Sequence, residues 1–387
     1  MSTVCEKNKC TGCMACVETC PKNAIKIKDT LEAYNAVIRD ELCIDCKACT
    51  RMCQNADAAI TFRKTISWCQ GWSRNAEKRK KASSGGAAYE LSRVVIERGG
   101  SVFSCLFSKG EFVFDEADTV QELEKFSGSK YVKSSPKNIY KKISRKLQSG
   151  REVLFIGLPC QVAALKCFTG ETKNLYTVDL ICHGTPSPKT LSRFFEQYGY
   201  KLDALEDIQF RIKSRCQITE GNYKTFTPEY VRDPYMIAFL NSLIYTENCY
   251  SCKYARRERV SDITIGDSWQ SDLSDESRKK GISLLLAQTQ KGEALIQKAD
   301  LETVPVDLEK AAAANHQLQH PSMEPDGRRD FFTSLKAGKK FNELVRKNYP
   351  KQYLKQQIKK ILSRTGIICG KEMIDYRIIF KERNDKS

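Results

Sequence analysis

The middle of the chain alternates between two hydrophobic patterns. Residues 151–157 and 175–181 are short, nearly continuous apolar runs, which are typical of strands buried on both faces. Residues 88–95 instead place apolar side chains three and four positions apart, as a helix does, and Arg98-Gly99-Gly100 supplies a glycine stop. Residues 101–107 again have the character of a strand. This alternation predicts an α/β core whose strands are partly parallel.

Two further helices follow the buried strands. We expect one helix at residues 162–168 and another at residues 185–198, with Ser187 as the N-cap of the second. A cysteine stands just after each strand, Cys160 in one case and Cys182 in the other. Because ligands collect at the carboxyl ends of parallel strands, these two thiols lie where a site is expected.

Cysteine is the most informative residue type in this sequence. The chain has 387 residues and 18 cysteines, and ten of the cysteines fall within the first 69 residues. The N-terminus has no apolar signal region, and a chain made in the cytosol keeps its thiols reduced. We therefore expect metal ligands rather than a disulfide scaffold.

The dense segment contains one motif twice. Residues 10–20 and residues 43–53 both have the form C-x2-C-x2-C-x3-C, which is the spacing of a bacterial two-cluster ferredoxin. The fourth cysteine of each motif points toward the other cluster, so two interleaved [4Fe–4S] sets are predicted. They are Cys10, Cys13, Cys16 and Cys53 for one cluster, and Cys43, Cys46, Cys49 and Cys20 for the other.

A structural zinc site is the alternative for these cysteines. Zinc usually takes four ligands as two CxxC pairs, and two runs of four cysteines fit that pattern poorly. Pro21 follows the first motif, as is usual in such ferredoxins, whereas Gln54 follows the second. Residues 24–27 and 59–62 are expected to be equivalent short strands, one after each motif, so the repeat ends near residue 63.

A candidate anion site follows the ferredoxin-like segment. The basic run at residues 74–81 leads into Ser83-Ser84-Gly85-Gly86 and then into the helix at 88–95. A Ser/Gly turn that opens a helix presents free N–H groups and the positive end of the helix dipole, so a phosphate-bearing cofactor would fit there. A simple serine N-cap on a solvated helix explains the same residues, and the pattern leaves both interpretations open.

Four cysteines outside the motifs are candidates for a third cluster. Cys160 and Cys182 end strands, and Cys249 and Cys252 form a CxxC pair. Two buried thiols beside an incidental CxxC pair are the alternative. The remaining cysteines are interpreted as ordinary thiols, and they are Cys5, Cys69, Cys105, Cys167, Cys216 and Cys369.

The positive charge is concentrated near the C-terminus. The formal net charge is +17, and residues 336–387 carry 15 Lys+Arg against 5 Asp+Glu. Ile358, Ile361 and Leu362 give this segment an apolar edge, which suits a solvated helix, an anionic lipid surface or an acidic partner. The sequence contains no run of about 20 apolar residues, so no membrane span is predicted. We expect a cytoplasmic protein, either free or peripheral at the inner membrane surface, that does not bind nucleic acid because no such motif is visible.

Several segments together resemble one family. The chain is similar to the coenzyme F420 hydrogenase/dehydrogenase beta-subunit family, preceded by a two-cluster ferredoxin. The matching segments are Ser83–Gly86, Ser129–Val132, Gly157–Gln161, Asp179–Gly184, Gln209–Lys213, Cys249–Ala255 and Ser261–Asp267.

The resemblance implies more than the spacing does. It implies an α+β ferredoxin-like dicluster domain at 1–63 and a mixed α/β domain for FAD and a [4Fe–4S] cluster at 64–335. It does not cover residues 336–387, which the charge and the apolar edge predict to be a basic helical tail. It also implies that Cys160, Cys182, Cys249 and Cys252 hold the third cluster. The residues implied for the flavin are Ser83, Ser84, Gly85, Gly86, Lys130 and Tyr131.

The implied activity is electron transfer through a flavin. A hydride carrier such as coenzyme F420 or NAD(P)H would exchange electrons with FAD, and the clusters would exchange them with an acidic ferredoxin or flavodoxin. Basic charge would steer such anionic partners. Two other functions remain open: a ferredoxin-fed flavin reductase of a small-molecule or polysaccharide-pathway substrate, and a non-catalytic electron-transfer subunit.

Overall fold

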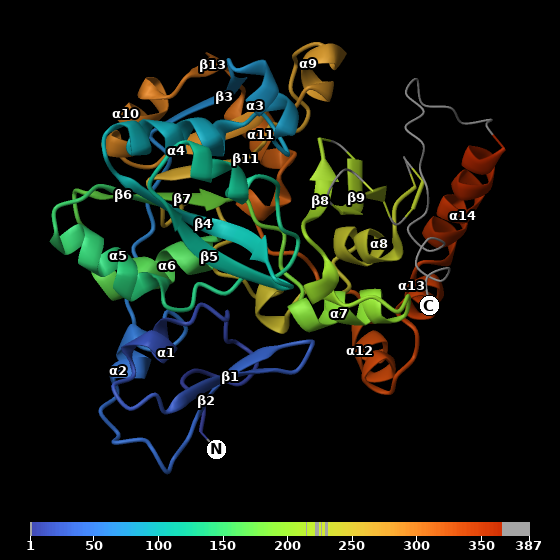
Figure 1. Ribbon diagram of the computed structural model, residues 1–387, viewed down its shortest axis with the longest axis horizontal. Coiled ribbons are helices and arrows are strands. Elements are labelled where there is room, and N and C mark those ends of the chain that lie inside the picture. Colours follow the sequence, from blue (N-terminus) through green and yellow to red (C-terminus); the bar gives the residue numbers. More distant parts are fainter. Residues whose placement is uncertain (1, 214, 221–223, 226, 229–230, 366–387) are drawn as a thin grey trace.

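The computed structural model describes residues 2–365, apart from 214, 221–223, 226 and 229–230 (Figure 1). It has a small N-terminal unit, a large mixed sheet covered by helices, and a helical lobe around a second small sheet. The residues beyond 365, with Cys369 and the end of the basic tail, lie outside the described part. None of the described helices is long and apolar enough to cross a membrane.

The N-terminal unit carries the two cysteine motifs in equivalent backbone. Helix α1 (Ala15–Thr19) and helix α2 (Ala48–Met52) each begin inside a motif, after a residue in the left-handed conformation, Met14 in one case and Lys47 in the other. Strands β1 (Ile25–Asp29) and β2 (Tyr34–Ile38) form an antiparallel hairpin. The same spacing therefore gives the same loop-to-helix turn twice.

The prediction of a strand at residues 59–62 is wrong. Strand β1 pairs with β2 instead, and residues 59–62 form no strand. Their apolar side chains are used for packing against the large domain, where the ring of Phe62 lies 5.9 Å from that of Tyr254. The next residue, Arg63, makes an isolated backbone bridge with Arg259. The segment thus connects the two units and does not complete a repeat.

The large sheet confirms the predicted α/β class. Its eight strands lie in the order β13-β3-β12-β11-β7-β6-β4-β5, and the central neighbours β4, β6, β7 and β11 are parallel. The strands are β3 (Ser67–Ser73), β4 (Ser101–Ser108), β5 (Glu111–Ala117), β6 (Val153–Gly157), β7 (Leu175–Leu180), β11 (Ile263–Asp267), β12 (Ser283–Ala287) and β13 (Leu301–Val304).

The predicted helices are present next to the predicted strands in the chain. Helix α4 (Ala87–Glu97) precedes β4, α6 (Pro159–Thr169) follows β6, and α7 (Pro188–Glu196) follows β7. Ser187 is the N-cap of α7, because its hydroxyl accepts a hydrogen bond from the backbone N–H of Lys189. The other helices of the sheet domain are α3 (Ala76–Lys81), α5 (Ile139–Gln148), α9 (Asp275–Lys279), α10 (Gln290–Lys298) and α11 (Leu308–Ala313), with 3-10 turns η1 (Gln121–Phe126), η4 (Glu247–Cys249) and η5 (His316–Leu318).

Helices α5 and α6 join the sheet to the N-terminal unit. Helix α1 packs against α5 and α6, and α2 packs against α6 (Figure 1). Because α6 begins at Pro159 and Cys160, this contact brings the ferredoxin-like unit next to the carboxyl end of β6. The fold therefore places the two sets of cysteine candidates side by side.

The helical lobe holds the start of the basic tail. It contains β8 (Ile208–Ile212), β9 (Arg215–Glu220), β10 (Lys224–Thr225), the turn η2 (Leu202–Ala204), and helices α8 (Pro234–Leu240), α12 (Arg328–Lys336), α13 (Phe341–Asn348) and α14 (Pro350–Arg364). Phe341, Leu344 and Val345 of α13 are buried in the core of this lobe. On α14, Leu354 and Ile361 are each 60% exposed, so its apolar edge faces outward.

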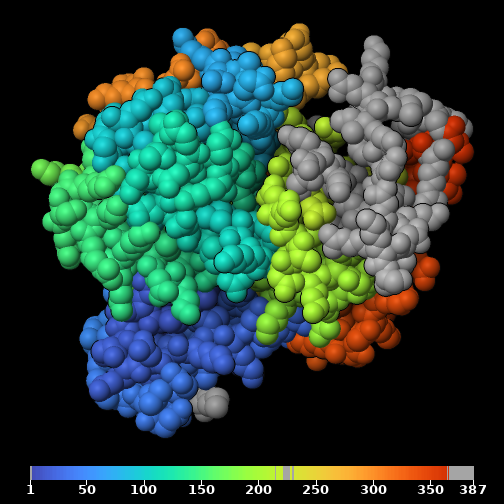
Figure 2. Space-filling view, in the orientation of Figure 1, coloured from blue at the N-terminus to red at the C-terminus, as the bar shows by residue number. Residues whose placement is uncertain are grey.

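The basic helix and the ferredoxin-like unit lie far apart. Figure 1 shows α14 on one side of the molecule and α1 and α2 at the opposite lower corner. In the space-filling view of Figure 2 the blue N-terminal unit likewise occupies one end, away from the red helix α14. Helix α12 does reach this unit, because Lys336 pairs with Glu32. The basic residues of α14 are therefore not beside the ferredoxin cysteines.

Candidate functional site

The four non-motif cysteines lie around one cavity, here called the core cavity. Cys160, Cys182, Cys249 and Cys252 all line this space of about 300 Å³. Strands β6 and β7 deliver the first two at their carboxyl ends, and η4 with its following loop delivers the CxxC pair. The structure thus brings together residues that are 92 positions apart in the chain, between 160 and 252.

Burial raises the pKa of three of these thiols, those of Cys160, Cys182 and Cys252. Burial, together with the charges of Cys249 and Cys252, raises the pKa of Cys182 to about 12. Burial also raises the pKa of Cys160 well above its ordinary value. A thiol must lose its proton to bind iron, so the donor set suits a metal that replaces four protons.

Two buried cations face the core cavity. Lys133 is 4% exposed and its Nζ donates a hydrogen bond of 3.1 Å to the carbonyl oxygen of Thr11. Arg259 is 2% exposed and its Nη2 donates a hydrogen bond of 2.9 Å to Oδ1 of Asp179. A cubane held by four thiolates is anionic, so fixed positive charge beside it offsets part of its burial cost.

One predicted ferredoxin set, here called site I, is buried. Cys10, Cys13, Cys16 and Cys53 line a single hollow of the N-terminal unit, together with Cys5. The sequence assigns Cys5 no role, because it stands outside both motifs. Its position depends on the fold of residues 2–5 against β2, and no spacing rule would have found it.

The other predicted set, here called site II, faces outward. Cys43 and Cys46 are exposed, and Cys20 and Cys49 are half-buried. Burial raises the pKa of the Cys49 thiol, and the charges of Cys20 and Cys46 raise it further. On either side of Cys43, Leu42 is 39% exposed and Ile44 is 57% exposed.

Backbone hydrogen bonds to sulfur repeat in the two motifs. The N–H of Gly12 donates to Sγ of Cys10 at 3.4 Å, and the N–H of Asp45 donates to Sγ of Cys43 at 3.4 Å. Such bonds stabilise a ligand sulfur and raise the reduction potential of the cluster it holds. In the described part of the chain no group of three or more His, Cys, Asp or Glu is arranged to hold a single metal ion.

Gln54 connects site I to the core cavity. It directly follows Cys53 and is 2% exposed. Its Nε2 donates a hydrogen bond of 2.7 Å to the carbonyl oxygen of Cys160, and its Oε1 accepts one from the hydroxyl of Tyr254. A proline in this position, such as Pro21 of the first motif, has no group for either contact. The departure from the usual motif was visible in the sequence, but its partner was not.

The Ser/Gly turn is packed between strands and the start of α4. Oγ of Ser84 donates to the carbonyl oxygen of Ile282 at 2.8 Å, and Oγ of Ser83 accepts from the N–H of Ser129 at 2.9 Å. A Cβ on Gly85 would lie 2.4 Å from the carbonyl oxygen of Gly71, so strand packing itself requires glycine there. Gly86 has a φ of 93° and is the N-cap of α4.

The other two flavin candidates lie close to this turn. Lys130 directly follows Ser129, whose backbone N–H donates to Oγ of Ser83. Its Nζ donates to the carbonyl oxygens of Phe126 and Ser127, at 3.1 and 2.6 Å. The ring of Tyr131 is stacked on that of Phe239, with centroids 4.5 Å apart and planes at 1°.

An excess of positive charge faces the Ser/Gly turn. Nζ of Lys213 donates to the carbonyl oxygens of Arg79 and Ser84, the latter at 2.8 Å. Arg211 binds Asp267 through both ends of its guanidinium, at 2.5 and 2.7 Å. Burial, followed by the charges of Arg79 and Arg211, lowers the pKa of Lys213 to about 8. Arg211 is paired with Asp267, whereas the hydrogen bonds described for Arg79 and Lys213 go to backbone carbonyl oxygens. The excess of positive charge favours a polyanionic ligand.

His183 lies between this charged group and the core cavity. It lines the cavity directly after Cys182, and its Nδ1 is 2.7 Å from Nε2 of Gln317. Burial, with the charge of His316, lowers the pKa of His183 to about 4, so the ring is neutral at neutral pH. The charges of Asp267 and Arg211 also act on His183. The two candidate sites are therefore adjacent.

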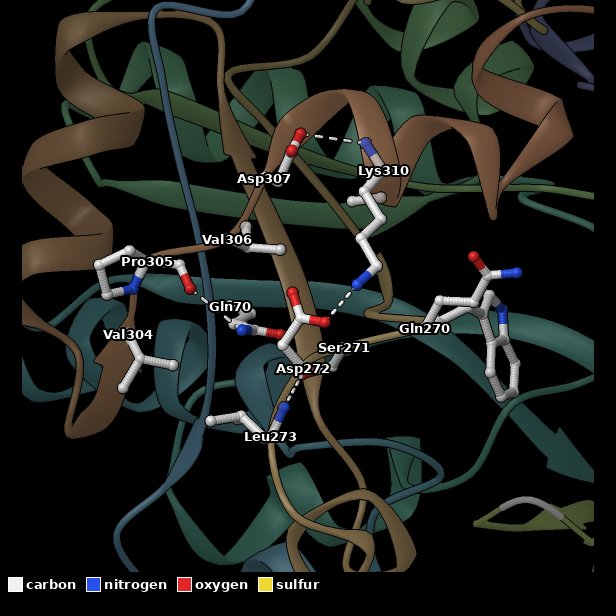
Figure 3. A pocket seen from close by; sticks show the side chains of 12 residues that line it. Gln70, Gln270, Ser271, Asp272, Leu273, Val304, Pro305, Val306, Asp307 and Lys310 are labelled. Atoms are coloured by element: carbon white, nitrogen blue, oxygen red, sulfur yellow. Dashed lines mark hydrogen bonds and ion pairs between the residues drawn. The ribbon is translucent and has the colours of Figure 1, made fainter.

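A second hollow of about 350 Å³ is lined by residues that follow β11 and by residues at and after the end of β13 (Figure 3). None of the predicted site residues lines it. Its polar groups satisfy one another: Lys310 pairs with Asp272, and Nε2 of Gln70 donates to the carbonyl oxygen of Pro305 at 3.0 Å. Its size alone gives no reason to place the chemistry there.

Comparisons with known proteins support the two parts separately. Residues 9–64 match the family model described as "4Fe-4S dicluster domain". Residues 150–310 match the model that describes the C terminus of the coenzyme F420 hydrogenase/dehydrogenase beta subunit. This second segment contains all four cysteines of the core cavity. The family resemblance inferred from the motifs is confirmed.

Among solved structures, a chain of the F420-reducing [NiFe] hydrogenase complex from Methanosarcina barkeri, studied as a xenon derivative, is similar to this chain. The two are 19% identical, the likeness covers 66% of this chain and 89% of that chain, and the TM-score is 0.48. No curated protein sequence shows significant similarity. The two family models, and not this structural likeness, support an electron-transfer iron–sulfur protein related to the F420 hydrogenase beta subunit.

Proposed function

Because the chain joins a 4Fe–4S dicluster domain to a domain of the F420 hydrogenase/dehydrogenase beta-subunit family, we propose that it is an iron–sulfur flavoprotein oxidoreductase. In this proposal electrons pass between a hydride carrier at FAD and the [4Fe–4S] clusters. The observation that carries it is the meeting of Cys160, Cys182, Cys249 and Cys252 at one cavity next to site I.

The core cavity would hold the third [4Fe–4S] cluster. Its donor set of four thiols fits a cubane, and the buried cations Lys133 and Arg259 fit the charge of one. The charge of Lys133 acts on Cys160 of the core cavity and also on Cys10 of site I. This lysine therefore favours an additional electron at either place.

The burial of the three predicted cluster sites, from the core cavity through site I to the exposed site II, supports one path for the electrons. The core cavity adjoins site I through Gln54, site I is buried, and site II has its thiols Cys43 and Cys46 at the surface. An external carrier would exchange electrons at site II, where Leu42 and Ile44 supply exposed apolar contact area. We propose a ferredoxin or flavodoxin as that carrier.

FAD would lie against the Ser/Gly turn. The cations Arg79, Arg211 and Lys213 fit its diphosphate, and Tyr131 supplies a flat face, with Ser83, Ser84 and the N-terminal end of α4 as hydrogen-bonding groups. A bound flavin exchanges hydride pairs for single electrons. The chain itself would orient the cofactor, and the neutral ring of His183 would lie between it and the core cavity.

Cofactor content tests this proposal. The full chain would be purified anaerobically, and iron, acid-labile sulfide and flavin would be assayed. With four irons per cubane, about twelve irons and one FAD per chain are expected. About eight irons and no flavin would contradict both the third cluster and the flavin site.

The hydride carrier is tested by reduction of the bound flavin. Reduced coenzyme F420 and NAD(P)H are the candidates, the first because the matching family model is named for coenzyme F420. Each would be added anaerobically, and reduced ferredoxin would be added in a parallel sample. If ferredoxin alone bleaches the flavin, the chain is instead a ferredoxin-fed reductase of another substrate.

A further inference from the structure

Site I contains one thiol more than a cubane needs. Cys5 lines the same hollow as Cys10, Cys13, Cys16 and Cys53, and it is 9% exposed. It packs in the same buried cluster as Cys10 and Cys53, which are two ligands of the same predicted cluster.

The backbone holds Cys5 in this position. The N–H of Val4 donates to the carbonyl oxygen of Ala36 at 2.9 Å, and Thr3 makes a bridge with Val37. Oγ1 of Thr3 also donates to the carbonyl oxygen of Cys5 at 2.7 Å. Residues 3–5 therefore extend along β2, and β2 fixes the approach of Cys5 to site I.

Site II has no such thiol. The position five residues before Cys43 is occupied by Ile38, which pairs with Ile25 in the hairpin. The other cysteines of the described chain lie elsewhere: Cys69 is in β3, Cys105 in β4, Cys167 in α6 and Cys216 in β9. The two motifs are alike in spacing, so this fifth thiol is a difference between two otherwise matched sites.

We propose that Cys5 is a reserve iron ligand of site I, able to replace Cys10 or Cys53. In the exchange, the bond from iron to Sγ of Cys5 forms and the bond from iron to Sγ of Cys10 breaks. The proton of the Cys5 thiol passes to the departing Cys10 thiolate, and no electron is transferred. The iron keeps four sulfur neighbours, and the net charge of the site is unchanged.

The consequence is that site I tolerates the loss of one ligand and site II does not. Site I is also the site that Gln54 connects to the core cavity, so a cluster lost there would break the electron path between the two units. A spare thiol at this point would preserve the path after oxidation or alkylation of Cys10.

Matched alanine variants test the proposal. Cys10→Ala and Cys43→Ala remove the first ligand of each motif, and the full chains would be purified anaerobically with iron, sulfide and the spectra of the reduced clusters measured. Cys10→Ala is expected to keep the iron content of the parent chain, whereas Cys43→Ala loses its cluster, about four irons. The double variant Cys5→Ala with Cys10→Ala is expected to lose as much, and Cys5→Ala alone to lose none.

Equal losses in Cys10→Ala and Cys43→Ala would overturn the proposal, as would a three-iron cluster in Cys10→Ala. Those results would leave the cluster assignment of site I intact. If Cys10→Ala gives no soluble chain, Cys53→Ala allows the same comparison, because Cys5 packs in the same buried cluster as both residues. Its matched partner is Cys20→Ala at site II.

Discussion

The side-chain amide of Gln54 lies 2.7 Å from the carbonyl oxygen of Cys160, and this hydrogen bond joins the ferredoxin-like unit to the core cavity. The residue before Gln54 is a predicted ligand of site I, and Cys160 is a predicted ligand of the third cluster. The bond therefore runs from one ligand backbone to the other. It also fixes Tyr254, whose hydroxyl donates to the same amide.

Replacing Gln54 by alanine should weaken this connection. The carbonyl of Cys160 and the hydroxyl of Tyr254 would each lose a buried partner, at a cost of about 1–3 kcal/mol per group. We expect slower electron transfer between the flavin and the ferredoxin clusters with unchanged iron content, measured by stopped-flow spectroscopy. Pro21→Gln, at the equivalent position of the first motif, is the control and should leave the rate unchanged. Equal rates in Q54A and the parent chain would contradict the path.

The cysteines show which parts of the site are predictable. The x2-x2-x3 spacing defines a loop and a helix start locally, so the eight motif positions could be read from the sequence alone. Cys160 and Cys182 could be placed at strand ends, because short apolar runs indicate buried strands. Lys133 and Cys5 could not be found, since each reaches its site only through packing between segments far apart in the chain.

Local patterns also failed where tertiary contacts decided the backbone. Residues 59–62 have a strand-like sequence, yet Phe62 packs against Tyr254 and β1 takes β2 as its partner. The Ser/Gly turn left a phosphate site and a simple helix cap open. The anion site is favoured by cations from distant segments, Arg211 of β8 and Lys213 of the turn that follows it.

Removing a thiol of the core cavity should remove one cluster and no more. Cys252→Ala is expected to lower the iron content by about four irons, from about twelve to about eight, because a cubane with three thiols is lost. Cys216→Ala is the control, since Cys216 lies in β9 and lines none of the predicted cluster sites. Iron and sulfide assays with spectra of the reduced protein give the result. Unchanged iron in C252A would remove this residue from the ligand set.

The affinity for FAD should fall as the pH rises through 8. Lys213 has a pKa lowered to about 8 by burial and by the neighbouring Arg79 and Arg211. It is therefore charged below that pH and neutral above it, and the neutral form attracts a diphosphate less. Fluorescence titration of the flavin-free protein below and above pH 8 measures the effect. In Lys213→Arg the guanidinium keeps its charge, so the dependence should disappear; a similar fall in that variant would point to another group.

The buried pair of Arg259 and Asp179 should matter far more than a surface pair of the same kind. Arg259→Met leaves the carboxylate of Asp179 buried without its cation, which is expected to cost about 3–5 kcal/mol. Arg257→Met breaks the exposed pair with Glu309 and should leave the free energy of unfolding nearly unchanged, because solvent screens that pair. Chemical denaturation of both variants, with iron assayed in parallel, compares them. Equal stability of the two would show that the buried pair does not support the core cavity.

Exposed apolar residues at two distant places allow the docking site of the external carrier to be tested. Leu42 and Ile44 flank Cys43 of site II, whereas Leu354 and Ile361 lie on the basic helix α14 at the other side of the molecule (Figure 1). An electron must cross only a short distance to the carrier, so docking at site II predicts that L42E/I44E slows reduction of ferredoxin and raises its KM. The double variant L354E/I361E adds the same charge and should leave that rate unchanged. The opposite result would place the carrier on α14, and the path from site II to the surface would then be wrong.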